Sequence, residues 1–157
     1  MTDVRIHPVT GKPLSRQVRV QTVSFGSLSE EIEIPGWYPD DDSDSIHSGA
    51  DLSEKEEAFQ RLRKLYGERV RKIRKKLGLT QVEAGALVGG GPRAFQKYEK
   101  GVMSPSDAAV GLLEILFADP EKIKVLKTLR KSRAASPVHV EAPFVRRKDS
   151  RRDHATV

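Results

Sequence analysis

The stretch VGGGPRAFQKYEKG, from Val88 to Gly101, places three consecutive glycines directly before a proline and a helix-forming run. Glycine accepts positive φ angles freely, so Gly89–Gly91 predict the end of one helix and a sharp turn. Pro92 suits the first position of the next helix, because the amide hydrogen that proline lacks has no partner there. Phe95 and Tyr98 lie three residues apart and therefore share one helix face. The pattern predicts two short helices joined by a tight turn.

The segments on either side extend the helical pattern. Thr80 is a preferred capping residue and predicts that the helix before the glycines begins with the next residue. Before it, apolar residues at helical spacing predict a longer helix: Phe59, Leu62, Leu65, Tyr66, Val70, Ile73 and Leu77. Gly67 interrupts this pattern and indicates either a bend or a boundary between two helices. Further on, Ser104–Pro105 and Asp119–Pro120 each predict the start of another helix. Residues 69–132 are therefore expected to form an all-α domain of five helices.

The two ends of the chain differ from this middle region. Near the start, alternating polarity predicts two strands with GSLS as the hairpin connection, and the apolar residues on strand-like spacing are Val18, Val20, Val23, Ile32 and Ile34. The last residues have little apolar periodicity and many arginines, which favours disorder. We predict an α+β protein with four parts: a small β domain (1–53), a connecting helix (54–68), the helical domain (69–132) and a disordered basic tail (133–157).

Composition limits the class of protein. Of the 157 residues 37% are hydrophobic and 32% are charged, which predicts a modest core. The absence of cysteine excludes disulfides, thiolate zinc sites and a cysteine nucleophile. No apolar run approaches the ~18 residues that span a membrane, and the N-terminus lacks the apolar stretch of a secretion signal. We expect a soluble, cytoplasmic protein without membrane contact, whose net charge of +6 is unevenly placed.

Nothing in the sequence indicates an enzyme. The acidic cluster of Asp40, Asp41, Asp42 and Asp44 lacks the spacing and closing glutamate of a calcium loop, and is expected to be solvated. No candidate nucleophile has a recognisable base partner, and the glycine run is accounted for by the turn between helices. We therefore predict no catalytic residue and no cofactor.

Two short helices joined by a tight turn form a helix-turn-helix, although an ordinary helical hairpin is compatible with the same pattern. The segment LTQVEAGALVGGGPRAFQKYEKG resembles the Xre/Cro family, in which L-T-Q opens helix two and E-x-G closes helix three. It departs at Gly85, where a small alanine is usual, and at Gly90, where an apolar residue is usual. A closer resemblance, over roughly residues 4–130, is to the MqsA (YgiT-type) antitoxin family. That family reads V-R-K-K-L-x-L-T-Q and then G-G-G-x-x-A-F-x-x-Y-E-K-G, and this chain has VRKIRKKLGLTQ and GGGPRAFQKYEKG.

The other half of that family is a small zinc-bound domain that binds the toxin and is built on two C-x-x-C pairs. Here the ligand places fall on His7 and Thr10 in the first pair, and on Pro39 and Asp42 in the second. Threonine and proline do not serve as zinc ligands, and one histidine with one aspartate cannot close a tetrahedral site, even with His47 nearby. The resemblance thus implies a zinc-ribbon-like domain without metal. We expect Trp37 and Tyr38, packed over Val18, Val20, Ile32 and Ile34, to replace the zinc.

The resemblance also implies DNA binding by helix three, expected from Pro92 to Lys100, in the major groove. The predicted base-contacting residues are Arg93, Gln96 and Lys97. Arg93 and Lys97 share a face, can both donate to guanine O6 and N7, and take the places of the family's base-contacting Asn and Arg. The predicted phosphate-contacting residues are Gln81, Arg74, Lys75, Lys76 and Lys100, of which Gln81 resembles the family's phosphate clamp.

These expectations combine into a repressor of the antitoxin type. A homodimer would bind a palindromic operator on double-stranded DNA, regulate its own toxin–antitoxin operon, and bind a toxin through the N-terminal domain. The helices expected at 105–117 and 120–131 carry more apolar residues than a small domain requires, which predicts the dimer interface. The alternatives are a helix-turn-helix regulator without a toxin, and a protein-interaction adaptor that no longer binds DNA.

Overall fold

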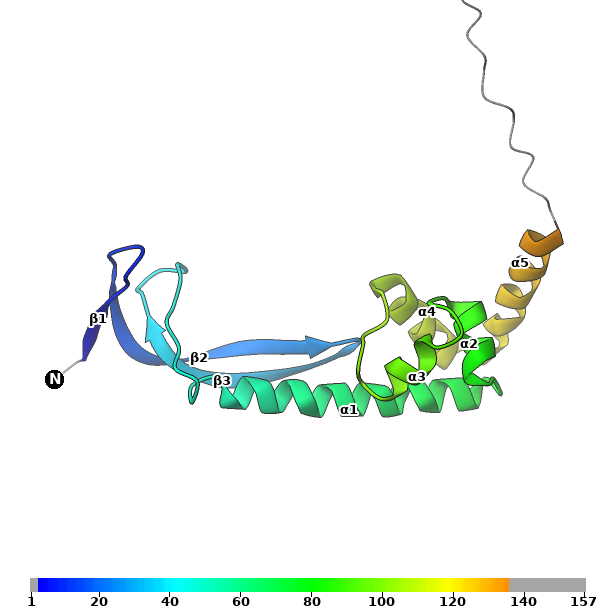
Figure 1. Ribbon diagram of the computed structural model, residues 1–157, viewed down its shortest axis with the longest axis horizontal. Coiled ribbons are helices and arrows are strands. Elements are labelled where there is room, and N and C mark those ends of the chain that lie inside the picture. The colour runs from blue at the N-terminus through cyan, green and yellow to red at the C-terminus, as the bar shows by residue number, and fades with distance from the viewer. Residues whose placement is uncertain (1–2, 136–157) are drawn as a thin grey trace, which may run out of the picture.

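The computed structural model describes residues 3–135 and shows an elongated molecule, with a β-hairpin at one end and a group of helices at the other (Figure 1). The elements in chain order are β1 (Val4–Ile6), β2 (Pro13–Phe25), β3 (Leu28–Tyr38), α1 (Ser53–Lys76), α2 (Gln81–Val88), α3 (Ala94–Glu99), α4 (Asp107–Ala118), a 3-10 helix (Pro120–Lys122) and α5 (Ile123–Ala135). Helix α1 packs against both the hairpin and the other helices and so joins the two ends. The predicted α+β class is confirmed.

The strands β2 and β3 form the predicted antiparallel hairpin. Gly26 and Ser27 make a two-residue turn between Phe25 and Leu28, which are paired across the strands. Gly26 has a φ angle of 61°, as the favoured two-residue hairpin turns require. The short strand β1 pairs with the start of β2, which gives the antiparallel order β1-β2-β3.

Only one face of the hairpin packs against α1. The buried residues of this layer are Val23, Ile32, Ile34, Ala58 and Leu62. Val18 and Val20, predicted to belong to the same apolar set, are 58% and 62% exposed. They pair with Pro35 and Glu33, and cross-strand partners share a face, so they point away from α1. Because more than half of each valine side chain is exposed, the prediction that they pack beneath Trp37 is wrong.

Trp37 and Tyr38, at the end of β3 far from the turn, are 7% and 3% exposed, as predicted. Arginine side chains lie against both rings. The guanidinium carbon of Arg5 lies 4.3 Å from the Trp37 ring centre, and that of Arg19 lies 4.5 Å from the Tyr38 ring centre. Cationic side chains thus lie over both buried rings at this end of the hairpin.

The loop between β3 and α1 is fixed by polar contacts. Asp51 is 4% exposed and accepts hydrogen bonds from the Arg16 guanidinium and from the backbone N–H of Ser48, at 2.7 Å in the second case. The hydrogen bond from Arg16 is the largest cause that holds the pKa of Asp51 well below its usual range. Trp37 and Ile46 also exchange two backbone hydrogen bonds of 2.8 and 2.9 Å.

Helix α1 is continuous through Gly67, so the glycine marks no break in it. Gly67 instead packs against the end of α3, where an added Cβ would lie 2.4 Å from the carbonyl oxygen of Glu99. The predicted boundary between residues 68 and 69 falls inside this helix. The division into a connecting helix and a helix-turn-helix domain stays a prediction.

The glycine run joins α2 to α3, as predicted. Thr80 caps α2: its hydroxyl accepts from the Glu83 N–H at 3.2 Å, and the Glu83 carboxylate accepts from the Thr80 N–H at 2.7 Å. Gly89–Gly91 have φ angles of 118°, 94° and 87°. The next helix begins at Ala94 and not at Pro92. Pro92 and Arg93 instead lie in a turn that is closed by a bond from the Ala94 N–H to the Gly91 carbonyl.

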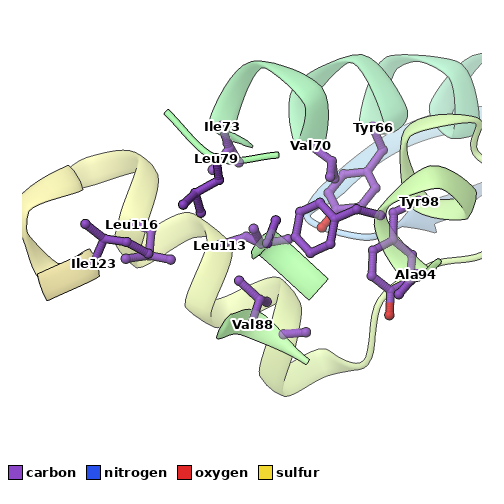
Figure 2. Close-up of a cluster of buried hydrophobic side chains, with 13 residues drawn as sticks. Tyr66, Val70, Ile73, Leu79, Val88, Ala94, Tyr98, Leu113, Leu116 and Ile123 are labelled. Carbon is purple, nitrogen blue, oxygen red and sulfur yellow. The ribbon is translucent and has the colours of Figure 1, made fainter. Parts of the chain in front are cut away.

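One apolar core lies between the helices (Figure 2). Its larger members are Tyr66, Val70, Ile73, Leu79, Val88, Phe95, Tyr98, Leu113, Leu116 and Ile123. Phe25 and Leu28, beside the hairpin turn, are partly buried against it. At the other end α5 continues to Ala135, past the predicted start of the tail at residue 133. The rest of the predicted tail, residues 136–157, lies outside the described residues.

Candidate nucleic-acid interface

Helix α3 is anchored on one side and exposed on the other. Phe95 and Tyr98 are 0% and 5% exposed, and their rings meet edge to face with centres 5.6 Å apart. Gln96 and Lys97 lie on the exposed side, and Arg93 is exposed at the residue that caps the helix start. The three residues predicted to contact bases therefore lie at or beside one short helix and are accessible from solvent.

A buried carboxylate fixes α3 to the two preceding helices. Glu99 accepts from Arg74 Nε at 2.5 Å and from Gln81 Nε2 at 3.0 Å, while Arg74 Nη1 donates to the carbonyl of Leu79 at 2.9 Å. The side chains of Arg74 and Glu99 are only 13% and 7% exposed. Burial raises the pKa of Glu99, but the hydrogen bonds from Arg74 and Gln81 outweigh it, so the net pKa shift is downward. Glu99 is therefore a charged, paired carboxylate.

A hollow of about 310 Å³ opens above this network. It is lined by Arg71, Arg74, Gln81, Gln96, Glu99 and Lys100, from three helices and the residue that follows the third. Because Arg74 compensates the charge of Glu99, the exposed cations Arg71 and Lys100 give the hollow a positive balance. A hollow with this charge and with amide donors suits an anion of phosphate size.

The basic run on α1 divides between two sides of the helix. Arg74 and Arg71 line the hollow, whereas Arg69, Lys72 and Lys76 lie against α4. The cationic groups of Arg69 and Lys76 are 4.6 Å from the Phe117 ring centre, and Lys76 Nζ donates to the Phe117 carbonyl at 3.0 Å. Of the residues predicted to contact phosphate, Lys75 and Lys100 are exposed, Arg74 and Gln81 are bonded to Glu99, and Lys76 contacts Phe117.

Sequence reasoning missed Glu99 at this site, and it named Arg71 only as one of a run of cations suited to contact with the DNA backbone. Glu99 stands in the E-x-G pattern that was interpreted only as the end of a helix, and its partner Arg74 lies 25 residues earlier. No spacing rule connects residues so far apart. Arg71 belongs to a run of six cations in eight residues, Arg69–Lys76, and the side of the helix on which each lies depends on where α4 packs.

The residues at the places where the resembled family has its zinc ligands do not fit zinc. Thr10 and Pro39 carry no suitable donor, and His7 is engaged, because its Nδ1 accepts from the backbone N–H groups of Val9 and Thr10 at 3.2 Å each. Within residues 3–135 no three histidine or acidic side chains are grouped to hold a metal ion. The loop between β1 and β2 is instead linked to the loop after β3 by Lys12. Its Nζ donates to Asp41 at 2.5 Å and to Ser43 Oγ at 3.1 Å.

The helices predicted to form a dimer interface expose apolar side chains. Ile115 on α4 and Val125 and Leu129 on α5 are 57%, 54% and 59% exposed. Val110 and Phe117, both on α4, are half-buried at the edge of the core. Within the described part of the chain, no helix is both long and apolar enough to cross a lipid bilayer.

Charge separates the two ends of the molecule. In residues 53–135 Lys and Arg outnumber Asp and Glu, and in residues 3–52 the reverse holds. The side of α3 that exposes Arg93 and Lys97 therefore belongs to the basic end. The acidic hairpin end lies away from it along α1 (Figure 1). The basic helical end therefore suits a negatively charged partner, and the acidic hairpin end suits a positively charged one.

The chain matches a known protein family and one of its members. Residues 41–129, more than half of the chain, match the family model described as the antitoxin component of bacterial toxin–antitoxin systems, MqsA. Over 56 residues the chain is 45% identical to the antitoxin MqsA of Escherichia coli (strain K12). That alignment covers 36% of this chain and 43% of the relative, so it spans less than half of either protein.

Proposed function

Because the chain belongs to the MqsA family of antitoxin components, we propose that it is a DNA-binding antitoxin that represses its own toxin–antitoxin operon. In this proposal α2 and α3 form a helix-turn-helix of the Xre/Cro type, and α3 enters the major groove. The observation that carries the proposal is the two-sided α3, buried through Phe95 and Tyr98 and exposed through Arg93, Gln96 and Lys97.

The residue roles follow from the contacts. Arg93, Gln96 and Lys97 contact base edges, and Lys75 and Lys100 contact phosphates on either side. Gln81 and the N-terminus of α2 offer donors to a phosphate at the hollow. Arg74, bonded to Glu99 and Leu79, acts by positioning α3, and Lys76 reaches phosphate only if it leaves Phe117.

The protein partner in this proposal is a toxin bound by the N-terminal part. Two observations support it: this end carries the opposite charge balance from the DNA-binding end, and it exposes Val18 and Val20 on the sheet face that α1 leaves uncovered. The protein has no catalytic role in the proposal and acts in the cytoplasm, where the operon is located.

The proposal includes a homodimer on a palindromic operator. Small helix-turn-helix domains reach useful affinity by pairing on half-sites about one helical turn, or ~34 Å, apart. The exposed Ile115, Val125 and Leu129 supply an apolar surface for such pairing.

The experiment compares binding of the full chain to the duplex upstream of its own reading frame and to random duplex of equal length. Specific sites bind typically ~10³-fold or more tighter than random DNA. Purification of the chain from its host, with identification of the co-purifying protein, tests whether the chain binds a toxin. Equal affinity for both duplexes would contradict repression by this protein.

A further inference from the structure

Helix α5 packs beside α2 at the end of the molecule away from the hairpin (Figure 1), and an open groove of about 380 Å³ lies between the two helices. None of the residues that line this groove also lines the hollow beside α3. Gln81 lines the hollow and Glu83 lines the groove, and residues two apart on a helix point to nearly opposite sides. The groove is therefore a separate feature, on another side of α2.

Helix α2 is apolar on nearly every side, although it lies at the surface. Gln81 and Glu83 are its only polar side chains, yet Val82 is 59% exposed and Ala86 is exposed as well. A helix that is apolar all round is normally buried. Within residues 3–135 the groove stays open above an apolar floor, which is made by Leu79, Ala86, Leu87 and Ala134. An apolar floor of this kind suits a bound apolar group.

Three cations of α5 border this floor. Lys127, Arg130 and Lys131 recur at spacings of three and four residues, so they lie on one side of the helix. Arg130 is held at the groove, because its Nη2 donates to the Leu87 carbonyl at 3.1 Å. The rim of the groove therefore carries positive charge directly beside apolar side chains.

The carboxylate in the lining is engaged by the helix cap. Glu83 accepts a hydrogen bond from the Thr80 N–H at 2.7 Å, and this bond is the largest cause that lowers the pKa of Glu83. Lys127 lies near enough to be a smaller cause of the same shift. Glu83 thus partly balances Lys127, and the charges of Arg130 and Lys131 remain in excess.

We propose that this groove is a binding site for a small amphipathic carboxylate, of the medium-chain fatty-acid type. Its apolar chain lies on Leu79, Ala86 and Leu87, and its carboxylate pairs with Arg130 and Lys131. The volume of about 380 Å³ falls in the range of small-molecule sites, about 300–1,000 Å³. Guanidinium and ammonium groups bind carboxylates through charge-assisted hydrogen bonds, and covering the floor removes apolar surface from water. The ligand contacts α2 and α5 together and so holds α5 against the helix that precedes α3.

The first test titrates the full wild-type chain with octanoate and with 1-octanol, which has the same chain length and no charge. Backbone amide resonances measured by NMR should shift most in α2 and α5. The octanoate shifts should saturate with a dissociation constant of roughly 0.1–2 mM. Octanol should bind at least about 5-fold more weakly, because it has no charge to pair with the cations. Shifts that do not saturate, shifts centred on other elements, or equal affinity for the two probes would overturn the proposal.

A matched pair of variants tests the floor. Ala86→Phe fills the groove with a ring and should weaken the binding of both probes at least about 10-fold. Val82→Phe adds the same ring one turn earlier on α2, outside the lining, and should bind both probes as the wild type does. Wild-type affinity in Ala86→Phe would show that the probes bind elsewhere. The titration of the wild type decides the proposal if Ala86→Phe does not fold.

A second matched pair tests the rim. Lys131→Gln removes one rim charge and should weaken octanoate about 3-fold or more while leaving octanol unchanged. Lys124→Gln removes a charge from the same helix outside the lining, where Lys124 pairs with Glu121, and should leave both probes unchanged. Equal loss of octanoate binding in the two variants would mean general attraction to a basic helix and would overturn the site.

This proposal and the proposed DNA binding fail separately. The titrations contain no DNA, and none of the substituted residues is assigned a contact with bases or phosphates. A chain that binds its operator but not octanoate would overturn the groove as a ligand site and leave DNA binding in place. A chain that binds octanoate at α2 and α5 but does not select an operator would do the reverse.

Discussion

The hairpin end and the helical end differ in what holds them together. At the helical end the helices enclose an apolar core in which Phe95, Leu113 and Leu116 are fully buried. At the hairpin end a thin apolar layer against α1 gives way to arginines over aromatic rings and to the pair of Arg16 with Asp51. The comparison teaches that apolar burial, and with it stability, is concentrated where α3 must be held rigidly.

The two ends are nevertheless connected at the hairpin turn. Phe25 meets Tyr66 edge to face at 5.9 Å, and Ser27 Oγ donates to Glu114 at 2.7 Å. Glu114 also accepts from Arg69 Nε of α1 at 2.8 Å. Loss of the helical core should therefore release the hairpin, whereas loss of the far end of the hairpin should leave the helices folded.

The largest effect is expected from Phe95→Ala. Truncation of this fully buried ring should lower the free energy of unfolding by about 3–5 kcal/mol. Both ends of the molecule should then unfold in one transition. Urea denaturation followed by far-UV circular dichroism measures it. A loss below about 1 kcal/mol would mean that the core of the helical end does not depend on α3.

Trp37→Ala should lower stability locally by about 2–3 kcal/mol, because it removes one of the two buried aromatic rings of the hairpin end. Hydrogen exchange should accelerate for the amides of β2 and β3 and stay slow for α2 to α4. The wild-type transition, followed by Trp37 fluorescence, should be the same with and without EDTA. An unfolding midpoint lowered by the chelator would contradict a metal-free domain. The candidate metal ligands would then be His7, Asp42 and His47.

Val23→Ala should cost about 2 kcal/mol, and the matched control Val20→Ala should stay within about 0.5 kcal/mol. Val23 is 6% exposed on the face against α1, and Val20 is 62% exposed on the other face. The midpoints of urea denaturation of the two variants measure these losses of stability. Equal losses would mean that both faces of the hairpin are covered in solution.

The smallest effect is expected from Tyr66→Phe, and it has the opposite sign. The Tyr66 hydroxyl is buried and has no hydrogen-bond partner within residues 3–135, so its removal should stabilise the helical end by about 1 kcal/mol. A decrease in stability at neutral pH would show that the hydroxyl has a partner.

The same variant has a pH signature. Burial raises the pKa of Tyr66 to about 12, above the value of ~10 for an unfolded tyrosine. The unfolded tyrosine therefore ionises at a lower pH than the folded one, so wild-type stability is unaffected by this group below pH ~10 and falls as the pH rises from 10 through 12. Between pH 9 and 11.5 the urea midpoint of the wild type should therefore fall more than that of Tyr66→Phe.

Much of the fold follows from local sequence patterns. GSLS predicts the hairpin turn, Thr80 predicts the helix cap, and the glycine run predicts the turn before α3. The face of the sheet to which Val18 and Val20 belong could not be predicted in this way. It depends on the register with β3 and on where α1 packs, and both are long-range contacts.

The candidate site was predictable to a similar degree. Arg93, Gln96 and Lys97 follow from the face opposite Phe95 and Tyr98. The bond of Arg74 to Glu99 and the position of Lys76 beside Phe117 depend on tertiary packing between helices, which no residue spacing reveals. A run of cations indicates that phosphate contact is favourable, but the packing decides which of them are available.

The most direct test of the DNA-binding account measures Arg93→Ala and Lys75→Ala on the operator and on random duplex, at several salt concentrations. Arg93→Ala should lose about 1–3 kcal/mol on the operator and much less on random DNA. Lys75→Ala should weaken both alike and reduce the salt slope by about 1. An equal loss on both duplexes for Arg93→Ala would contradict the claim that α3 reads bases.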